Sequence, residues 1–77
     1  MIEIGNVVKL TDNKNYIVAN ILELHSVKYA YLITEEEPVQ VLVATIKDVA
    51  GTSILEEIKD SNELDYVLNQ FALATNE

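Results

Sequence analysis

The 77-residue chain contains no cysteine and no arginine, and it has only two glycines and one proline. Without cysteine it can build neither a disulfide framework nor a thiolate metal site. No apolar run approaches the ~18 residues that a membrane-spanning helix requires. Because the chain also begins at Met1 without a basic, apolar leader, we expect a cytoplasmic protein that does not bind a membrane.

Acidic residues dominate the charge: thirteen carboxylates against five lysines give a net charge of −8 at pH 7. This charge repels polyanions, and phosphate neutralisation supplies most of the affinity of nucleic-acid-binding proteins. Tyr29 and Tyr31 share one face of a predicted strand, as base-stacking aromatics do, but such aromatics lie in basic grooves. We therefore expect no nucleic-acid binding. Instead, one of these tyrosines should pack under the C-terminal helix, with both hydroxyls reaching water.

The centre of the predicted sheet is a hairpin. Residues 16–25 and 27–34 are rich in β-branched and aromatic side chains, and a tight connection near His25 and Ser26 joins them. The middle of the second strand is apolar on both faces, because Tyr29 and Tyr31 alternate with Ala30 and Leu32. We expect this strand to be covered on both sides.

The first hairpin strand contains an irregularity. Its apolar positions change parity between Ile21 and Leu22, and a regular two-residue alternation cannot place both sets on one face. Either the strand is buried on both faces, or a bulge resets the register. We predict a bulge or strong bend within Ala19–Glu23, which turns both Ile17 and Leu24 toward the core.

Three further strands and one helix complete the predicted single domain, residues 1–77. A polar turn at residues 11–15 and the acidic, proline-containing loop 35–38 separate the early strands. Residues 39–49 carry few charges, so we expect this strand to be paired on both sides or covered by a second copy in a homodimer. In the last strand Ile54 and Leu55 are expected to face inward. The predicted strands are 7–10, 16–25, 27–34, 39–49 and 53–58, and the predicted helix is 62–72.

The C-terminal segment changes to a helical period. Apolar residues at i, i+3, i+4 and i+7 form the stripe of an amphipathic helix: Leu64, Val67, Leu68 and Phe71. Asp60, followed by Glu63 three residues later, is a helix start signal. We therefore predict a mainly β (α+β) fold: a five-stranded bent antiparallel sheet or small barrel, with a C-terminal amphipathic helix that covers its open side or one end.

The segment Gly5-Asn-Val-Val-Lys-Leu10, followed by a polar turn and a Tyr-Ile-Val strand, resembles the opening of many small SH3-like barrel proteins. The layout is also similar to short acidic proteins of Gram-positive bacteria and their phages, which share a Tyr-x-Tyr-Leu strand and a C-terminal Leu/Phe helix. Here the matching segments are Gly5–Leu10, Tyr29–Leu32 and Leu64–Phe71. These are mostly core positions in proteins that are largely uncharacterised, so the resemblance implies a fold and no catalytic residue.

No pattern in the sequence indicates an enzyme. Glycine-rich phosphate loops, paired carboxylates at a defined spacing and nucleophile motifs are absent. His25 is the only histidine, and we interpret it as a surface residue at the hairpin tip, although Glu23 could share its face. Residues 35–37 could ligate a hard cation but do not resemble a calcium loop. We predict no catalytic, cofactor-binding or metal-binding residue.

Two functions remain. The first is a small acidic, non-enzymatic module that binds an unidentified protein partner. The alternative is a nucleic-acid-mimicking inhibitor of phage or bacterial origin, whose acidic surface occupies the basic cleft of a host enzyme. Both would use carboxylates from two segments, which form one patch if the segments lie on the same side. The candidate partner-binding residues are Glu35, Glu36, Glu37, Glu56, Glu57 and Asp60.

Overall fold

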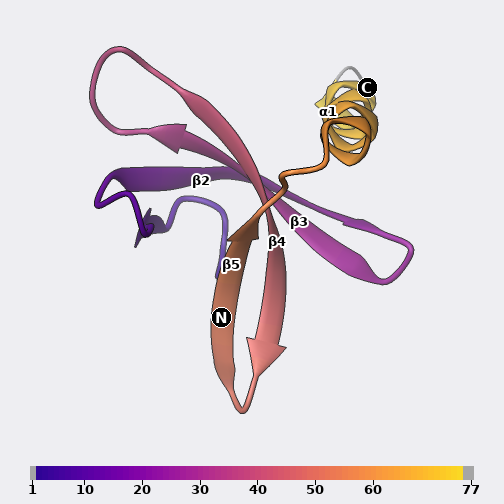
Figure 1. Cartoon of the computed structure of the whole chain (residues 1–77), viewed down its shortest axis with the longest axis horizontal. Helices are drawn as coiled ribbons and strands as arrows, with labels where there is room; N and C mark the ends of the chain where they lie inside the picture. Colours follow the sequence, from indigo (N-terminus) through magenta and orange to yellow (C-terminus); the bar gives the residue numbers. More distant parts are fainter. Residues whose placement is uncertain (1, 76–77) are drawn as a thin grey trace.

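A computed structural model describes residues 2–75 and contains five antiparallel strands and one helix (Figure 1). The elements are β1 (Val7–Lys9), β2 (Asn15–Leu24), β3 (Val27–Thr34), β4 (Val41–Val49), β5 (Thr52–Glu57) and α1 (Ser61–Thr75). The strands lie in the order β1-β2-β3-β4-β5, so each pairs with its neighbour in sequence. The sheet curls into a half-barrel, and β1 and β5 are its two unpaired edges. The predicted fold class is confirmed, with a bent sheet rather than a closed barrel.

The predicted strand for residues 39–49 is shorter than expected. Val39 and Gln40 belong to the β3–β4 loop, where the hydroxyl of Thr34 accepts a hydrogen bond from the amide of Gln40 at 2.8 Å. The strand itself pairs with β3 and β5, so the expectation that it is paired on both sides is confirmed. The helix extends beyond the predicted residue 72 to Thr75.

Two short turns set the register of the central strands. His25 and Ser26 both have positive φ, at 51° and 68°, as a type I′ hairpin turn requires. Ala50 and Gly51 repeat this geometry between β4 and β5, at 51° and 84°. Each turn is a two-residue loop between directly paired strand ends, which holds the flanking strands tightly together.

A β-bulge at Ala19 resets the register of β2. Val18 pairs with Leu32, but Asn20 pairs with Tyr31, so Ala19 is the extra residue. The bulge lies within the predicted interval. The bulge was also predicted to turn Ile17 toward the core. Ile17 instead faces away from the inner core described below.

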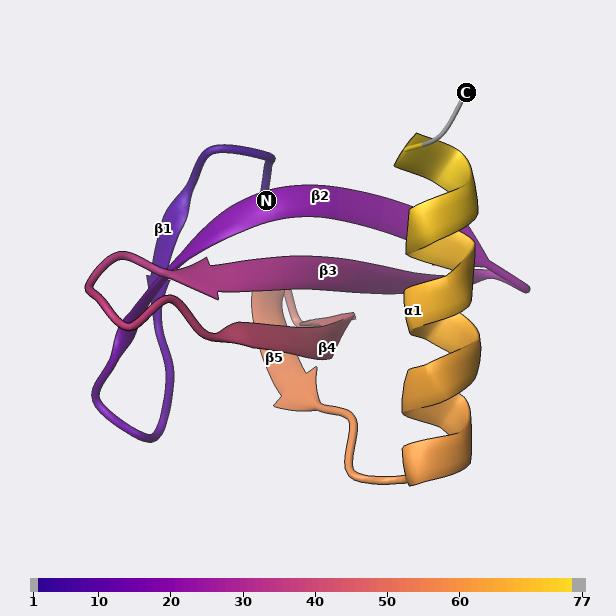
Figure 2. The ribbon, with the colours of Figure 1, turned by 90° about the horizontal axis from the view of Figure 1, so that it is seen from above.

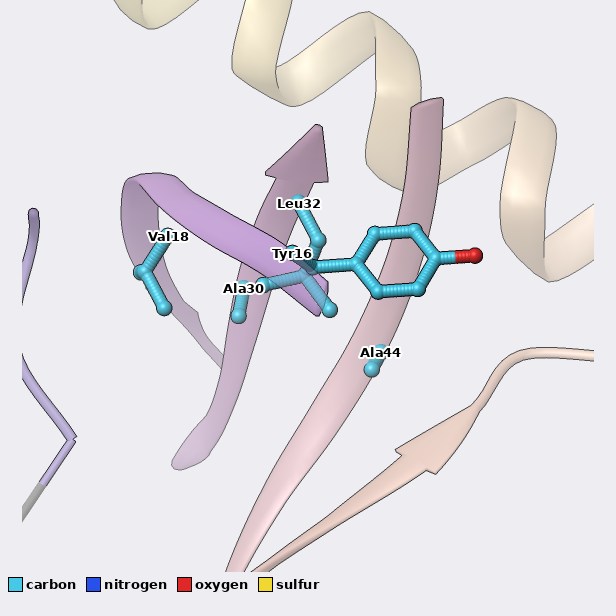
Figure 3. Close-up of a cluster of buried hydrophobic side chains, with 5 residues drawn as sticks. All are labelled: Tyr16, Val18, Ala30, Leu32 and Ala44. Atoms are coloured by element: carbon cyan, nitrogen blue, oxygen red, sulfur yellow. The ribbon is translucent and has the colours of Figure 1, made fainter. Parts of the chain in front are cut away.

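The inner core lies on the concave face of the sheet (Figure 3). β2, β3 and β4 contribute its buried side chains, which are Tyr16, Val18, Ala30, Leu32 and Ala44. Ile21 packs against this core although its parity differs from that of Val18, because the bulge lies between them. The bulge places Ile17 and Leu24 on one face despite their opposite parity, as predicted, but this is the outer face. Leu24 packs in the helix core described next, whereas Ile17 belongs to neither core.

The helix core lies on the opposite face of the same strands. Its buried residues are Tyr29, Val43, Ile58, Val67 and Phe71, with Leu22, Leu24, Leu64 and Leu68 packed around them. The Tyr31 and Phe71 rings are tilted at 57° with their centroids 5.5 Å apart. The predicted helix stripe is thus confirmed as core, and β3 is covered on both faces. Figure 2 shows α1 crossing the sheet near the β2–β3 hairpin and leaving the other end of the sheet bare.

Asp60 is the N-cap of α1. Its Oδ1 accepts hydrogen bonds from the amides of Asn62 at 2.8 Å and Glu63 at 3.2 Å. These bonds satisfy backbone donors that the first helical turn leaves unpaired. The predicted start signal is confirmed.

Candidate interaction surfaces

An aliphatic row runs across four strands on the outer face, at the end that α1 leaves bare. Direct strand pairing aligns Val7 with Ile17, Ile17 with Ile33, and Ile33 with Val41. Paired residues share one face of a sheet, so these four side chains form one surface, called here the outer aliphatic row. Val7 and Val41 are 56% and 50% exposed, and the two isoleucines are partly exposed. None of the four belongs to either core cluster.

The sequence-based reasoning missed this row. Each of its residues was recognised as apolar, but the register that aligns them depends on four strands separated along the chain. The signal that could have revealed the row was the presence of apolar residues at both odd-numbered and even-numbered positions of β2, β3 and β4. One set of these positions is buried in the inner core. The other set lies on the outer face of the sheet, and α1 covers only part of it.

A groove occupies the seam where the half-barrel fails to close. It has a volume of about 440 Å³ and lies between β1 with its following turn and β5. We call it the seam groove. Its apolar lining comes from Ile2, Val8, Leu10, Leu42, Ala44 and Leu55, and its charged lining from Lys9, Asp12 and Glu57. Of the two neighbours expected to face inward in β5, only Leu55 does so; Ile54 is 42% exposed, because adjacent strand residues point to opposite faces.

Asp12, one of the two carboxylate residues that line this groove, lies beside the Tyr16 hydroxyl. The hydroxyl donates a hydrogen bond to Oδ2 of Asp12 at 2.8 Å. This bond, together with burial of the ring and the negative charge of Glu57, raises the pKa of Tyr16. The pKa of Asp12 is lowered, first by the hydrogen bond from the amide of Lys14 and then by the bond from Tyr16. Asp12 is therefore held as a carboxylate.

The six predicted partner-binding carboxylates do not form one patch. Glu36 and Glu37 lie beside the β1–β2 turn, where Lys14 donates a hydrogen bond to Oε1 of Gln40 at 3.2 Å. Glu57 lines the seam groove, and Asp60 caps the helix. The β3–β4 loop and the start of α1 are well separated in both views of the ribbon (Figures 1 and 2). Two separate acidic segments therefore replace the single patch considered from the sequence.

Glu56 is partly neutralised. Lys47 Nζ lies 2.6 Å from its Oε1, across the β4–β5 pair. Glu56 and Glu57 are neighbours in β5, so their side chains point to opposite faces of the sheet. Only Glu57 is available to the seam groove.

A second apolar depression, of about 410 Å³, lies beside α1. Its lining includes Ala19, Asn20, Tyr31 and Leu68. The bulge contributes to this depression, because Ala19 is the unpaired extra residue of β2. Tyr31 lines it and is also two residues from Ile33, so the depression lies next to the outer aliphatic row.

The tyrosines and the histidine have structural positions. Tyr31 packs against Phe71, as predicted, but the Tyr29 hydroxyl bonds to Glu63 instead of reaching water. Burial and then this bond raise the pKa of Tyr29. His25 is exposed at the hairpin turn, and its positive φ allows the two-residue connection between β2 and β3. Sequence reasoning had no means of choosing Glu63 as the partner, because it is 34 residues away from Tyr29.

Within residues 2–75, no three acidic or histidine side chains gather closely enough to hold a metal ion. In the same part of the chain, no helix has the length and apolar character needed to cross a membrane. Comparison of the sequence with protein-family models and with curated proteins, and of the structure with solved structures, found no match. What the chain does must therefore be inferred from its own surfaces.

Proposed function

We propose that this chain is a small acidic, non-enzymatic module that binds another protein through the outer aliphatic row. The observation that carries the proposal is the alignment of four aliphatic side chains across four strands, with the two outermost ones half exposed. Contiguous exposed apolar surface on a small protein commonly marks an interaction site. Burial of such a row would favour association through the hydrophobic effect.

The charge next to the row indicates the chemistry of the partner. The acidic loop begins two residues after Ile33 and ends just before Val41, and it contains Glu35, Glu36 and Glu37. All three are exposed. A partner segment with apolar side chains flanked by lysine or arginine would therefore complement this end of the sheet. The net charge of −8 would also speed its encounter with a basic partner.

Nucleic-acid mimicry remains the second candidate, and the net charge of −8 is the observation in its favour. A mimic needs carboxylates distributed along one surface, as phosphates are. Here the acidic loop and the carboxylates near α1 occupy separate places, and Glu56 is paired with Lys47. Binding through the aliphatic row is thus the better-supported function. A cytoplasmic location belongs to the same proposal.

The test compares two matched substitutions in β4. Val41→Ser removes an aliphatic side chain from the row, whereas Val49→Ser changes the same residue type, at similar exposure (54%), at the other end of the strand. Each variant and the wild type would be immobilised and used to capture proteins from a lysate of the source cells at low and high salt. We expect one partner to be retained by the wild type and by Val49→Ser, and lost with Val41→Ser.

The salt series separates the two candidate functions. Capture through the row persists at high salt, because apolar burial is not screened. Mimicry predicts capture that disappears with salt and is equal for both serine variants. Light scattering of the free protein would detect a homodimer; a dimer that Val41→Ser dissociates would identify a second copy as the occupant of the row and contradict a separate partner.

A further inference from the structure

The seam groove lies between the two edge strands of the sheet. β5 pairs with β4 alone, and β1 pairs with β2 alone. In an antiparallel ladder, residues alternate between bonding one neighbour and pointing their backbone groups to the other side. Just beyond β5, the amide of Ile58 donates to the carbonyl of Val43 at 3.1 Å. By alternation, the backbone groups of Ser53, Leu55 and Glu57 point away from β4, toward the seam.

The same three residues line the groove with their side chains. Within residues 2–75, the seam therefore has a row of backbone donors and acceptors that no second strand pairs, together with an apolar lining from Val8, Leu10 and Leu42. A free strand edge is a template for another strand. An extended segment suits this combination, since it can pair its backbone with β5 and place alternate side chains in the groove.

The charged residues that line the groove indicate which side chains such a segment should carry. Asp12 and Glu57 both line the groove, and Asp12 accepts a hydrogen bond from the Tyr16 hydroxyl, whereas Lys9 is the single cation of the lining. The groove thus has an excess of negative charge in a protein that is already strongly acidic. A second copy of this chain would bring a further net charge of −8 to the seam, which disfavours pairing between two β5 edges.

We propose that the seam groove accepts an extended peptide segment that adds to the sheet beside β5. Every second residue of this segment faces the groove, and these groove-facing residues are aliphatic apart from one lysine or arginine at one end. The aliphatic side chains enter the groove between β1 and β5. A basic side chain reaches Asp12 and Glu57. This inference goes beyond the proposed function, because it concerns the opposite face of the sheet and a different mode of binding.

The probe is a short acetylated peptide with valine at alternate positions, serine between them and lysine at the last groove-facing position. It is titrated into the isotope-labelled full chain and followed by NMR. We expect saturable binding, with slowed hydrogen exchange at the amides of Ser53, Leu55 and Glu57. The same peptide with N-methyl groups along its pairing edge should bind about tenfold more weakly or worse, because it cannot donate to β5. Replacing its lysine by glutamate should weaken binding, because the glutamate would face Asp12 and Glu57.

Two neighbouring residues supply matched protein variants. Glu57→Gln should weaken binding of the lysine-containing peptide by about two- to fivefold and reduce its salt dependence. Glu56→Gln changes the same residue type one position away, on the other face of the sheet, and should leave the affinity unchanged. Val41→Ser should also leave it unchanged, so failure at the outer aliphatic row and failure at the seam are distinguishable.

Three results would overturn the proposal. The first is equal affinity for the methylated and unmethylated peptides, since this would exclude backbone pairing. The second is a set of peptide-induced shifts confined to the outer aliphatic row. The third is protection of the Ser53, Leu55 and Glu57 amides in the free protein together with a dimeric mass, which would show that a second copy already occupies the edge.

Discussion

The hydroxyl of Tyr29 donates a hydrogen bond to Oε2 of Glu63 at 3.1 Å, and this bond joins the central strand of the sheet to the first turn of α1. Glu63 stands three residues after the N-cap, where a glutamate often bonds back to the cap amide. Here its carboxylate serves the tertiary structure instead. The bond fixes the start of the helix over the helix core.

Tyr29→Phe removes this bond and should reduce the free energy of unfolding by about 1 kcal/mol, because the ring packing is retained. Urea denaturation would measure the loss. Tyr66→Phe is the control, since Tyr66 is 47% exposed. In a Glu63→Ala background Tyr29→Phe should cost much less; an equal cost in both backgrounds would show that the two residues do not interact.

Alkaline pH should destabilise the protein through Tyr16 and Tyr29. Both tyrosines have pKa values raised above the ordinary 10.0 in the folded state. Below pH 10 both are protonated whether the chain is folded or not, so their contribution to stability is fully present. As the pH rises through the folded pKa values, the unfolded chain has already released these protons and the contribution is lost. Unfolding measured from pH 8 to 12 should show falling stability, with a shallower fall for Tyr29→Phe. Identical slopes for wild type and variant would contradict this account.

The stripe of α1 should contribute unequally to stability. Phe71 is 3% exposed and should cost about 3–5 kcal/mol when changed to alanine, whereas Leu68 is only partly buried and should fall near the low end of the ~2–5 kcal/mol range. Leu73, 64% exposed, is the control and should change stability by less than about 0.5 kcal/mol. Thermal and urea melts would rank the three variants. A Phe71→Ala variant as stable as Leu73→Ala would mean that the helix does not pack against the sheet.

Asp60→Ala should destabilise the protein by about 1 kcal/mol through loss of the N-cap bonds to Asn62 and Glu63. Asp60→Asn keeps an acceptor oxygen and should recover most of the loss. Denaturant midpoints would compare the two. If Asp60→Asn were as damaging as Asp60→Ala, the carboxylate charge rather than the capping bond would be the stabilising feature.

The features predicted well from the sequence are those that depend on near neighbours. The helix stripe from Leu64 to Phe71 follows from side-chain spacing along one helix. The tight connection at His25 and Ser26 and the cap at Asp60 follow from residues adjacent in the chain. The bulge could be placed within five residues because the parity change at Ile21 and Leu22 is visible in one strand.

The errors concern which face each set of residues occupies. Ile17 was expected to face the core, but Tyr16 and Val18 do so. Apolar residues occur at both the odd-numbered and the even-numbered positions of this strand. Local alternation therefore does not show which of these two sets of residues faces inward. Ile54 was misassigned for a related reason: two adjacent aliphatic residues cannot both face one side of a regular strand.

The strands and helix of this protein, their order and the buried stripe of the helix can be derived from the sequence, because these depend on periods of two and 3.6 residues and on local turn chemistry. Two features are apparent only in the folded chain: the sheet remains open between β1 and β5, and Val7, Ile17, Ile33 and Val41 align in one partly exposed row. The same holds for the separation of the acidic loop from Asp60 and for the bond between Tyr29 and Glu63. These features arise from the curl and register of strands distant in the chain. These features therefore cannot be derived from any single segment of the sequence.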